Sequence, residues 1–127
     1  MRKEPTELDG LKILVLEDNF LVAEQICDVL IESGCEVVGP AADLDRGWRA
    51  LADVELNGAL LDINLAGSFS FPIAAYLTER GVPFIFLSGY DDISVLPREY
   101  RAVARISKPL DPAELVSAIA NKFAAGR

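Results

Sequence analysis

Apolar residues along the chain fall into short runs that alternate with longer amphipathic stretches. Branched and other apolar residues fill five short runs, at residues 11–16, 35–39, 59–63, 82–87 and 102–107. Such runs predict β-strands. Between and after them, apolar residues recur every three or four positions, which is typical of helices that bury one face. The chain is therefore predicted to consist of repeated strand–helix units.

Capping and terminating residues delimit the helices. Their predicted positions are residues 20–32, a second helix capped by Asp43, residues 73–80, and a last helix opened by Asp111 and Pro112. Gly34 is expected to end the first of these. Pro97 interrupts residues 90–100, so any helix in that stretch should be short or irregular.

The alternation of strands and helices predicts an α/β fold with a doubly wound parallel sheet. The run at 59–63 is apolar on both faces until Asp62, as expected for a central strand that is covered by helices on both sides. Sheets of this kind bind ligands at the carboxyl ends of their strands. Polar residues at that edge are therefore the candidates for a binding site.

Size and charge narrow the classes of function. A chain of 127 residues, about half of them apolar, suits one domain, which we expect at residues 11–124 after a flexible lead-in at 1–10, with no output domain. The formal net charge of −8 argues against nucleic-acid binding. No apolar run is long enough to cross a membrane, so a cytoplasmic protein is expected. Cys27 and Cys35 have no His beside them in the sequence to complete a metal site and should be partly or fully buried thiols.

Four of the five predicted strands end at, or are followed by, residues whose side chains can bind a metal ion or take part in a reaction. These residues are Glu17 and Asp18, Asp62, Ser88, and Lys108. Three carboxylates at one edge repel each other unless a cation binds, and an oxygen-only site suits Mg²⁺. Lys108 and the Ser88 hydroxyl could neutralise and orient a phosphoryl group there. Asp62, the central carboxylate, would be the nucleophile.

At these positions the sequence resembles the receiver domains of bacterial response regulators, from Leu11 to Phe123. The resemblance implies a flavodoxin-like five-stranded parallel sheet with strand order 2-1-3-4-5. It also implies that Asp62 is the phosphoacceptor, that Glu17, Asp18, Asp62 and the backbone carbonyl of Asn64 bind Mg²⁺, and that Ser88 and Lys108 bind the phosphoryl group. The Lys108–Pro109 bond would be cis.

The resemblance further implies a protein that assists its own phosphorylation and dephosphorylation without being an enzyme in the ordinary sense. Its phosphoryl donor would be a histidine kinase or a histidine phosphotransfer protein, and its output a contact with a downstream protein. The run from Pro83 to Tyr90 is similar to a motif, Phe-Ala-Thr-Gly followed by an aromatic residue, of alphaproteobacterial stand-alone receivers. Leu87 and Ser88 replace Ala-Thr of that motif.

Arg105 stands where most receivers carry an aromatic switch residue. A guanidinium is costly to bury without a partner, so Arg105 is expected at the surface, available to Asp91 and Asp92 or to an acidic partner. The moving element would then be residues 90–100, with Tyr90 as a candidate for the readout.

Three alternatives remain open. An aspartyl-nucleophile phosphatase would need a second acid where Asn64 stands, and its motif usually lies on the first strand. A flavin- or nucleotide-binding domain would have a glycine-rich, uncharged loop in place of residues 17–19. The third alternative is a receiver fold that binds partners without phosphorylation, against which the intact acid set and Lys108 argue.

Overall fold

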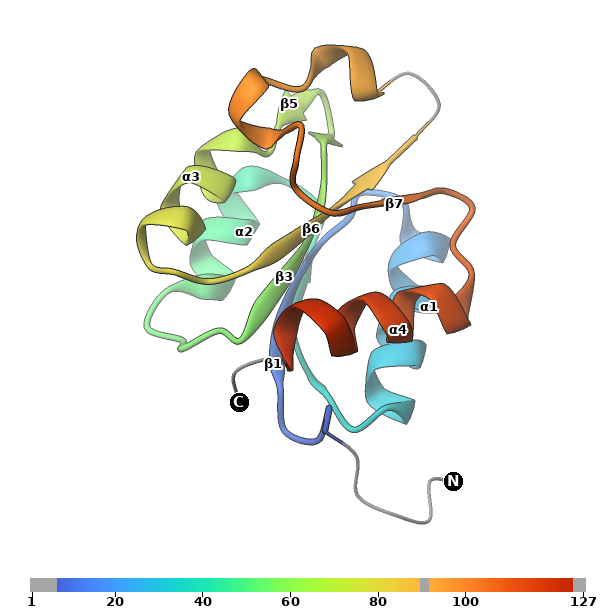
Figure 1. Cartoon of the computed structure of the whole chain (residues 1–127). Coiled ribbons are helices and arrows are strands. Elements are labelled where there is room, and N and C mark those ends of the chain that lie inside the picture. Colours follow the sequence, from blue (N-terminus) through green and yellow to red (C-terminus); the bar gives the residue numbers. More distant parts are fainter. Residues whose placement is uncertain (1–6, 90–91, 125–127) are drawn as a thin grey trace.

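A five-stranded parallel sheet lies at the centre of the computed structural model, which describes residues 7–89 and 92–124 (Figure 1). Its strands are β1 (Lys12–Leu16), β2 (Glu36–Ala41), β3 (Gly58–Asp62), β6 (Phe84–Ser88) and β7 (Arg105–Ser107). They are arranged in the order β2-β1-β3-β6-β7, and every pair is parallel. Since β6 and β7 are the fourth and fifth strands of this sheet along the chain, the predicted order 2-1-3-4-5 is confirmed.

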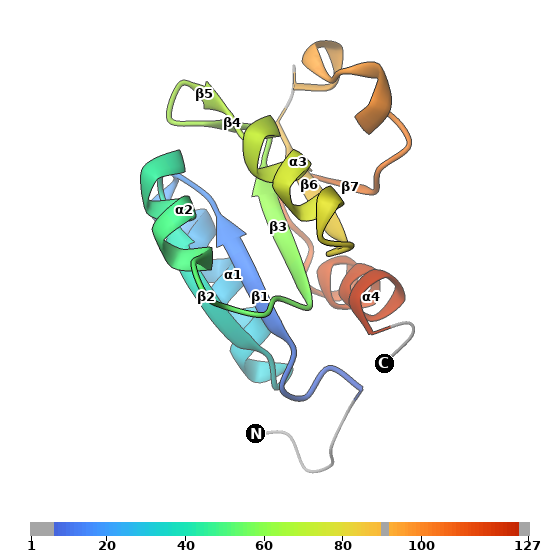
Figure 2. The same cartoon turned by 90° about the vertical axis from the view of Figure 1, so that its left-hand side faces the viewer.

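Helices cover both faces of the sheet (Figures 1 and 2). Those on one face are α1 (Phe20–Glu32) and α4 (Pro112–Phe123); those on the other are α2 (Leu44–Leu51) and α3 (Phe71–Glu79). Alternate residues of β1 supply the two cores: Ile13 packs with the α1 and α4 side chains, and Leu14 with those of α2 and α3. Burial of apolar side chains on both faces explains the continuous apolar runs of the sequence.

The predicted caps are present. Asp43 accepts a hydrogen bond from the amide of Arg46 at 2.8 Å, and Asp111 accepts one from the amide of Ala113 at 3.2 Å. Gly34 follows α1 with φ +91°, a conformation that glycine adopts without strain. Asn19, which the sequence analysis did not identify as a cap, accepts from the amide of Val22 at 3.1 Å. These bonds fix where the connecting loops turn back toward the sheet.

Several boundaries differ from the predictions. β2 continues through Pro40, which was expected to close it; a proline is tolerated there because β2 lies at an edge of the sheet and needs fewer N–H donors. The helix predicted at 73–80 begins two residues earlier and is α3. β7 begins at Arg105 instead of Ala102, because the residues before it form a turn after a short helix.

A β-hairpin follows β3 where the sequence analysis expected only a loop. It consists of β4 (Asn64–Leu65) and β5 (Ser68–Phe69), which pair antiparallel. The two residues between them, Ala66 and Gly67, have φ values of +52° and +88°. Two-residue hairpin turns need this left-handed geometry.

The irregular stretch before β7 contains two 3₁₀ helices, η1 (Asp92–Val95) and η2 (Arg98–Tyr100). This confirms that any helix there is short. Tyr100 is buried, and its ring centroid lies 5.6 Å from that of Phe86 and 5.5 Å from that of Phe71. The aromatic contacts therefore attach η2 to the α2–α3 side of the core.

The start of the described chain packs against the rest of the domain. Leu8 is buried in the core between α1 and α4, and the amide of Gly10 donates to the carbonyl of Gly34 at 2.8 Å. Leu8 and Gly10 thus contact the domain that was expected to begin at Leu11. Cys35 is buried and Cys27 half-buried, and among the described residues neither forms a disulfide. Within residues 7–89 and 92–124, no helix is long and apolar enough to cross a membrane.

Candidate functional site

The predicted site residues meet at the carboxyl edge of the sheet. Glu17 directly follows β1, Asp62 ends β3, Ser88 ends β6 and Lys108 follows β7. The strand register holds them together: Asp62 lies opposite Leu87, and the amide of Lys108 donates to the carbonyl of Ser88 at 2.9 Å. The polar residues that were predicted at four separate strand ends thus form one cluster in space.

Three carboxylates form an acidic pocket. One oxygen each from Glu17, Asp18 and Asp62 lies within 4.8 Å of the others. Glu17 and Asp62 are only 2% and 3% exposed, whereas Asp18 is exposed to solvent. Charges buried this close together need a cation to offset their repulsion.

Lys108 supplies one positive charge to the pocket. Its Nζ lies 2.6 Å from Asp62 Oδ1 and 2.8 Å from Glu17 Oε1. Burial alone would lower the pKa of Lys108, but its close contacts with the Asp62 and Glu17 carboxylates outweigh burial and hold the pKa above its usual value. The ammonium group is therefore charged and spans the two buried acids.

Asp62 is the perturbed acid of the pocket. Burial raises its pKa to about 8; the hydrogen bond from Lys108 opposes this rise, and the neighbouring Glu17 adds to it. Glu17 uses one oxygen, Oε2, to accept a hydrogen bond from the amide of Asn19 at 3.0 Å. Its other oxygen is buried and contacts Lys108 without forming a well-oriented hydrogen bond.

The β4–β5 hairpin closes one side of the pocket. Asp18 Oδ2 accepts a hydrogen bond from the amide of Ala66 at 3.2 Å, and Asn64 Oδ1 accepts one from the amide of Gly67 at 3.1 Å. Ser70 is fully buried behind it, and its amide donates to the carbonyl of Ile63 at 3.0 Å. Ala66 and Ser70 were not predicted as part of the site; the sequence signal for the turn that places them is Gly67.

The remaining predictions concern the Lys108–Pro109 bond, Arg105, Tyr90 and Asp91. The Lys108–Pro109 bond is cis, the isomer that the family resemblance implied, and so is Gly39–Pro40, which was not anticipated. Arg105 is exposed, and its guanidinium donates to the carbonyl of Arg101 at 3.1 Å. Tyr90 and Asp91 lie outside the described residues.

Asp92, the other acid proposed to be near Arg105, accepts a hydrogen bond from the amide of Gly89 at 2.6 Å. In the described part of the chain no ion pair joins it to Arg105. Arg105 is thus at the surface, as expected, without the acidic neighbour that Asp92 would have supplied.

Comparison with known proteins identifies this architecture. The family model for the response regulator receiver domain matches residues 13–120. The phosphate regulon transcriptional regulatory protein PhoB of Escherichia coli K12 is 32% identical over 114 residues, which cover 85% of this chain and 49% of PhoB. The chain spans about half the length of the curated relatives that it matches.

Solved structures show the same fold. SdrG from Sphingomonas melonis Fr1 superposes with a TM-score of 0.78 at 28% identity, over 87% of this chain and 94% of SdrG. It is an alphaproteobacterial stand-alone receiver, which confirms the resemblance drawn from the sequence. The receiver domain of the sensor histidine kinase PA1611 from Pseudomonas aeruginosa PAO1, solved with a magnesium ion coordinated in its active-site cleft, has a TM-score of 0.73 at 21% identity, over 92% and 99% of the two chains.

The family match, the sheet order and the acidic pocket thus agree. The chain belongs to the response regulator receiver domains of two-component signalling, and its Glu-Asp-Asp pocket is typical of the phosphoacceptor site in that family.

Proposed function

We propose that Asp62 accepts a phosphoryl group from a histidine kinase or a histidine phosphotransfer protein, with Mg²⁺ bound beside it, and that the phosphorylated domain signals by contact with another protein. One observation carries the proposal: Lys108 Nζ contacts both Asp62 and Glu17 inside a pocket of three acids. Receiver domains usually act as phosphoacceptors and not as true enzymes. The same role accounts for the positions of the polar residues predicted at this edge: Glu17, Asp18, Asp62, Ser88 and Lys108.

The residues of the pocket fit a divalent cation. Glu17 Oε1 is buried without a well-oriented hydrogen bond, and ionisation of all three carboxylates beside one lysine would leave two negative charges uncompensated. Only oxygen ligands are offered, which suits Mg²⁺. Glu17, Asp18, Asp62 and the backbone carbonyl of Asn64 would hold the ion. The magnesium in the P. aeruginosa receiver supports the same kind of ion here.

The transfer would proceed by in-line attack of an ionised Asp62 oxygen on phosphorus. A phosphorus–oxygen bond forms, the phosphorus–nitrogen bond of the phosphohistidine breaks, and the electron pair leaves with the imidazole. Bound Mg²⁺ would offset negative charge on the transferring oxygens. Lys108 would exchange its contact with Asp62 Oδ1 for a phosphoryl oxygen, and the Ser88 hydroxyl would donate to another.

Phosphorylation with a small phosphodonor tests this proposal. Incubation with acetyl phosphate and Mg²⁺ should add the mass of one phosphoryl group, and Asp62→Asn or removal of Mg²⁺ by a chelator should abolish the gain. Asp45→Asn, which changes an exposed acid on α2, is the matched control and should be labelled normally. Undiminished labelling of the Asp62→Asn protein would remove the central assignment.

Substitutions of the two supporting residues, Asp18 and Lys108, should have different effects. Asp18→Asn removes a metal ligand and should weaken Mg²⁺ binding in calorimetry. Lys108→Ala should leave Mg²⁺ binding largely intact while impairing phosphorylation or its structural readout. Equal loss of Mg²⁺ affinity in both variants would contradict this division of roles.

We further propose that residues 90–100, and not Arg105, carry the readout. Two observations support this proposal: Arg105 is exposed, and Tyr100 packs against Phe86, which lies two residues before Ser88 on the same strand. A shift of Ser88 toward a phosphoryl group would therefore change the packing of Tyr100 against Phe86. Amide hydrogen exchange with and without a stable phosphoryl mimic should show altered protection between Ser88 and Tyr100. A change confined to α1 would rule this readout out.

A further inference from the structure

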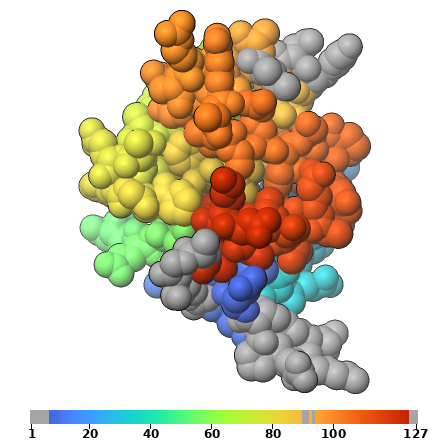
Figure 3. All heavy atoms as spheres, in the orientation of Figure 1, coloured from blue at the N-terminus to red at the C-terminus, as the bar shows by residue number. Residues whose placement is uncertain are grey.

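A cavity lies at the amino edge of the sheet, where the strands begin, and the acidic pocket lies where they end. Its volume is about 780 Å³, a size typical of sites for small organic ligands. In the space-filling view the green segment before β3 lies directly beside the yellow segment of α3, and both contribute to its walls (Figure 3). The residues around this amino-edge cavity are Lys12, Leu51, 53–57, Tyr76, Arg80 and Val82. The described residues that line it include none of those assigned to phosphoryl transfer.

One wall of the amino-edge cavity is apolar. Leu51, the last residue of α2, is buried, whereas Val54, Leu56 and Val82 are half-buried. All four belong to, or pack against, the core between the sheet and the helices α2 and α3. The half-buried side chains keep part of their apolar surface in contact with water. A ligand with an apolar group would gain free energy by covering that surface.

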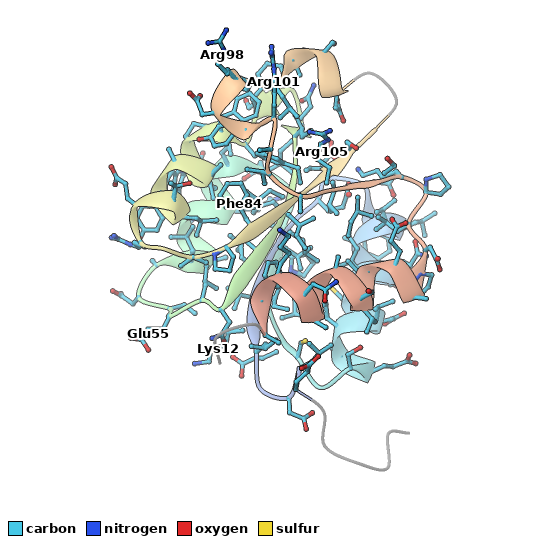
Figure 4. The ribbon with its side chains drawn as sticks, in the orientation of Figure 1. Lys12, Glu55, Phe84, Arg98, Arg101 and Arg105 are labelled. Carbon is cyan, nitrogen blue, oxygen red and sulfur yellow. The ribbon has the colours of Figure 1, made fainter. Side chains whose placement is uncertain are left out.

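Four charged residues surround the apolar wall: the cations Lys12 and Arg80, and the acids Asp53 and Glu55. Lys12 faces the α2–α3 side of the sheet because it lies two residues before Leu14 on β1. Figure 4 shows Lys12 and Glu55 at the same end of the sheet. Among the residues that the structure describes, no ion pair joins either acid to either cation. The cavity therefore offers a ligand charges of both signs.

Both cations are held in place by contacts that leave their charges available. Asn57 Oδ1 accepts a hydrogen bond from the amide of Lys12 at 2.8 Å, and the amide of Asn57 donates to the carbonyl of Lys12 at 2.8 Å. The guanidinium carbon of Arg80 lies 4.0 Å from the centroid of the Tyr76 ring. That ring packs edge-on against Trp48 of α2, with centroids 5.3 Å apart. This order before binding lowers the entropic cost of holding a ligand.

We infer that the amino-edge cavity binds a small zwitterion with an apolar body, of the class of short peptides with free ends. The ligand carboxylate would bind Lys12 and Arg80, the ligand ammonium would bind Asp53 and Glu55, and the apolar side chains would cover the apolar wall. An anion without a positive group would be repelled by the two acids, and a cation without a negative group by the two basic residues. The inference goes beyond phosphoryl transfer and does not depend on Asp62.

Titration of the whole chain with the dipeptide leucyl-leucine tests the inference. Amide chemical shifts would be followed at about pH 6, where both ends of the dipeptide are charged, without Mg²⁺ or a phosphodonor. We expect shifts in residues 51–57 and 76–82. Two analogues each remove one charge: leucyl-leucinamide lacks the carboxylate, and N-acetyl-leucyl-leucine lacks the ammonium. Each should bind the native protein about tenfold more weakly than the dipeptide, a comparison that needs no variant to fold.

Removal of the two positive charges should act on one end of the ligand. In the variant Lys12→Gln with Arg80→Gln, we expect the dipeptide to bind about tenfold more weakly. The dipeptide and leucyl-leucinamide should then bind this variant equally, because the partners of the carboxylate are gone. The matched control, Arg98→Gln with Lys122→Gln, changes the net charge equally at exposed sites elsewhere and should bind as the native protein does.

Removal of the two negative charges should act on the other end. In the variant Asp53→Asn with Glu55→Gln, the dipeptide should lose about tenfold in affinity and bind no more tightly than N-acetyl-leucyl-leucine. Here the matched control is Asp45→Asn with Glu24→Gln, two exposed acids on α2 and α1, and it should bind normally.

Several results would overturn the inference. One is binding of either analogue to the native protein as tightly as the dipeptide. Others are undiminished binding of the dipeptide by either paired variant, and a loss of equal size in its matched control. Absence of shifts at millimolar dipeptide, or shifts at the acidic pocket in place of residues 51–57 and 76–82, would have the same meaning.

Discussion

Lys108 has two tasks at the scale of single residues. It offsets the charge of Asp62 and Glu17 in the ground state, and it is the donor placed to follow charge onto a phosphoryl group. Lys108 carries one positive charge, whereas Glu17, Asp18 and Asp62 would together carry three negative charges when ionised. The pocket can therefore bind a further cation. Burial, with the neighbouring Glu17, raises the pKa of Asp62 to about 8, so that without the metal this acid keeps a proton below that pH.

Mg²⁺ binding should therefore release a proton. Below about pH 8 the metal-free Asp62 holds a proton that a bound cation would displace, so the affinity for Mg²⁺ should rise with pH and level off above that value. Calorimetry in two buffers of different ionisation enthalpy measures the release at pH 7. The Asp62→Asn protein is the control and should release none. Identical heats in both buffers for the native protein would contradict the prediction.

The raised pKa of Asp62 also determines whether the stability of the fold rises or falls with pH. An unfolded aspartate has a pKa of about 3.9, so between that value and about 8 the folded, metal-free protein binds more protons than the unfolded chain. The free energy of unfolding should consequently fall as pH rises through this window. Chemical denaturation at pH 5 and pH 8 in the presence of a chelator would detect it, and Asp62→Asn should flatten the trend.

At the scale of elements, contact between α4 and β3 depends on a glycine. A Cβ on Gly58, the first residue of β3, would overlap the ring of Phe123 at the end of α4. Phe123 is itself buried in the core between α1 and α4. The absence of a side chain at Gly58 is therefore what lets the last helix lie close to the sheet.

Gly58→Ala should destabilise the fold by about 1–3 kcal/mol, because the ring must move to make room. The midpoint of thermal unfolding measures the loss. In a Phe123→Leu background the same substitution should cost less, since leucine leaves space. Equal costs in both backgrounds would show that Phe123 is not the obstacle.

Sequence patterns predicted the elements that alternate regularly and failed where local geometry decides. The bounds of α1 and the cap at Asp43 followed from apolar spacing and a capping side chain. The β4–β5 hairpin did not, because Ala66 occupies a left-handed position usually taken by glycine or asparagine. Strand-end positions indicated Glu17, Asp62, Ser88 and Lys108, but the hydrogen bond from Ala66 to Asp18 depends on that hairpin.

At the scale of the whole molecule, a cation that binds only the folded pocket should stabilise the entire domain. The expected gain is about 2.7 kcal/mol at a free Mg²⁺ concentration a hundredfold above Kd. Thermal unfolding with increasing MgCl₂ measures it, against NaCl of matched ionic strength, because salt alone screens the repulsion of a chain with net charge −8. The Asp18→Asn protein should respond less to Mg²⁺. An equal response to both salts would contradict specific binding.

The two outer strands of the sheet have a consequence for solubility. Exposed strand edges are templates for pairing between molecules and hence for aggregation. Here β2 contains Pro40, which has no N–H to donate, and β7 is three residues long and begins with an exposed arginine. Both edges thus offer little to a second sheet. Contacts of this protein with others should accordingly be made through side chains and not by extension of the sheet.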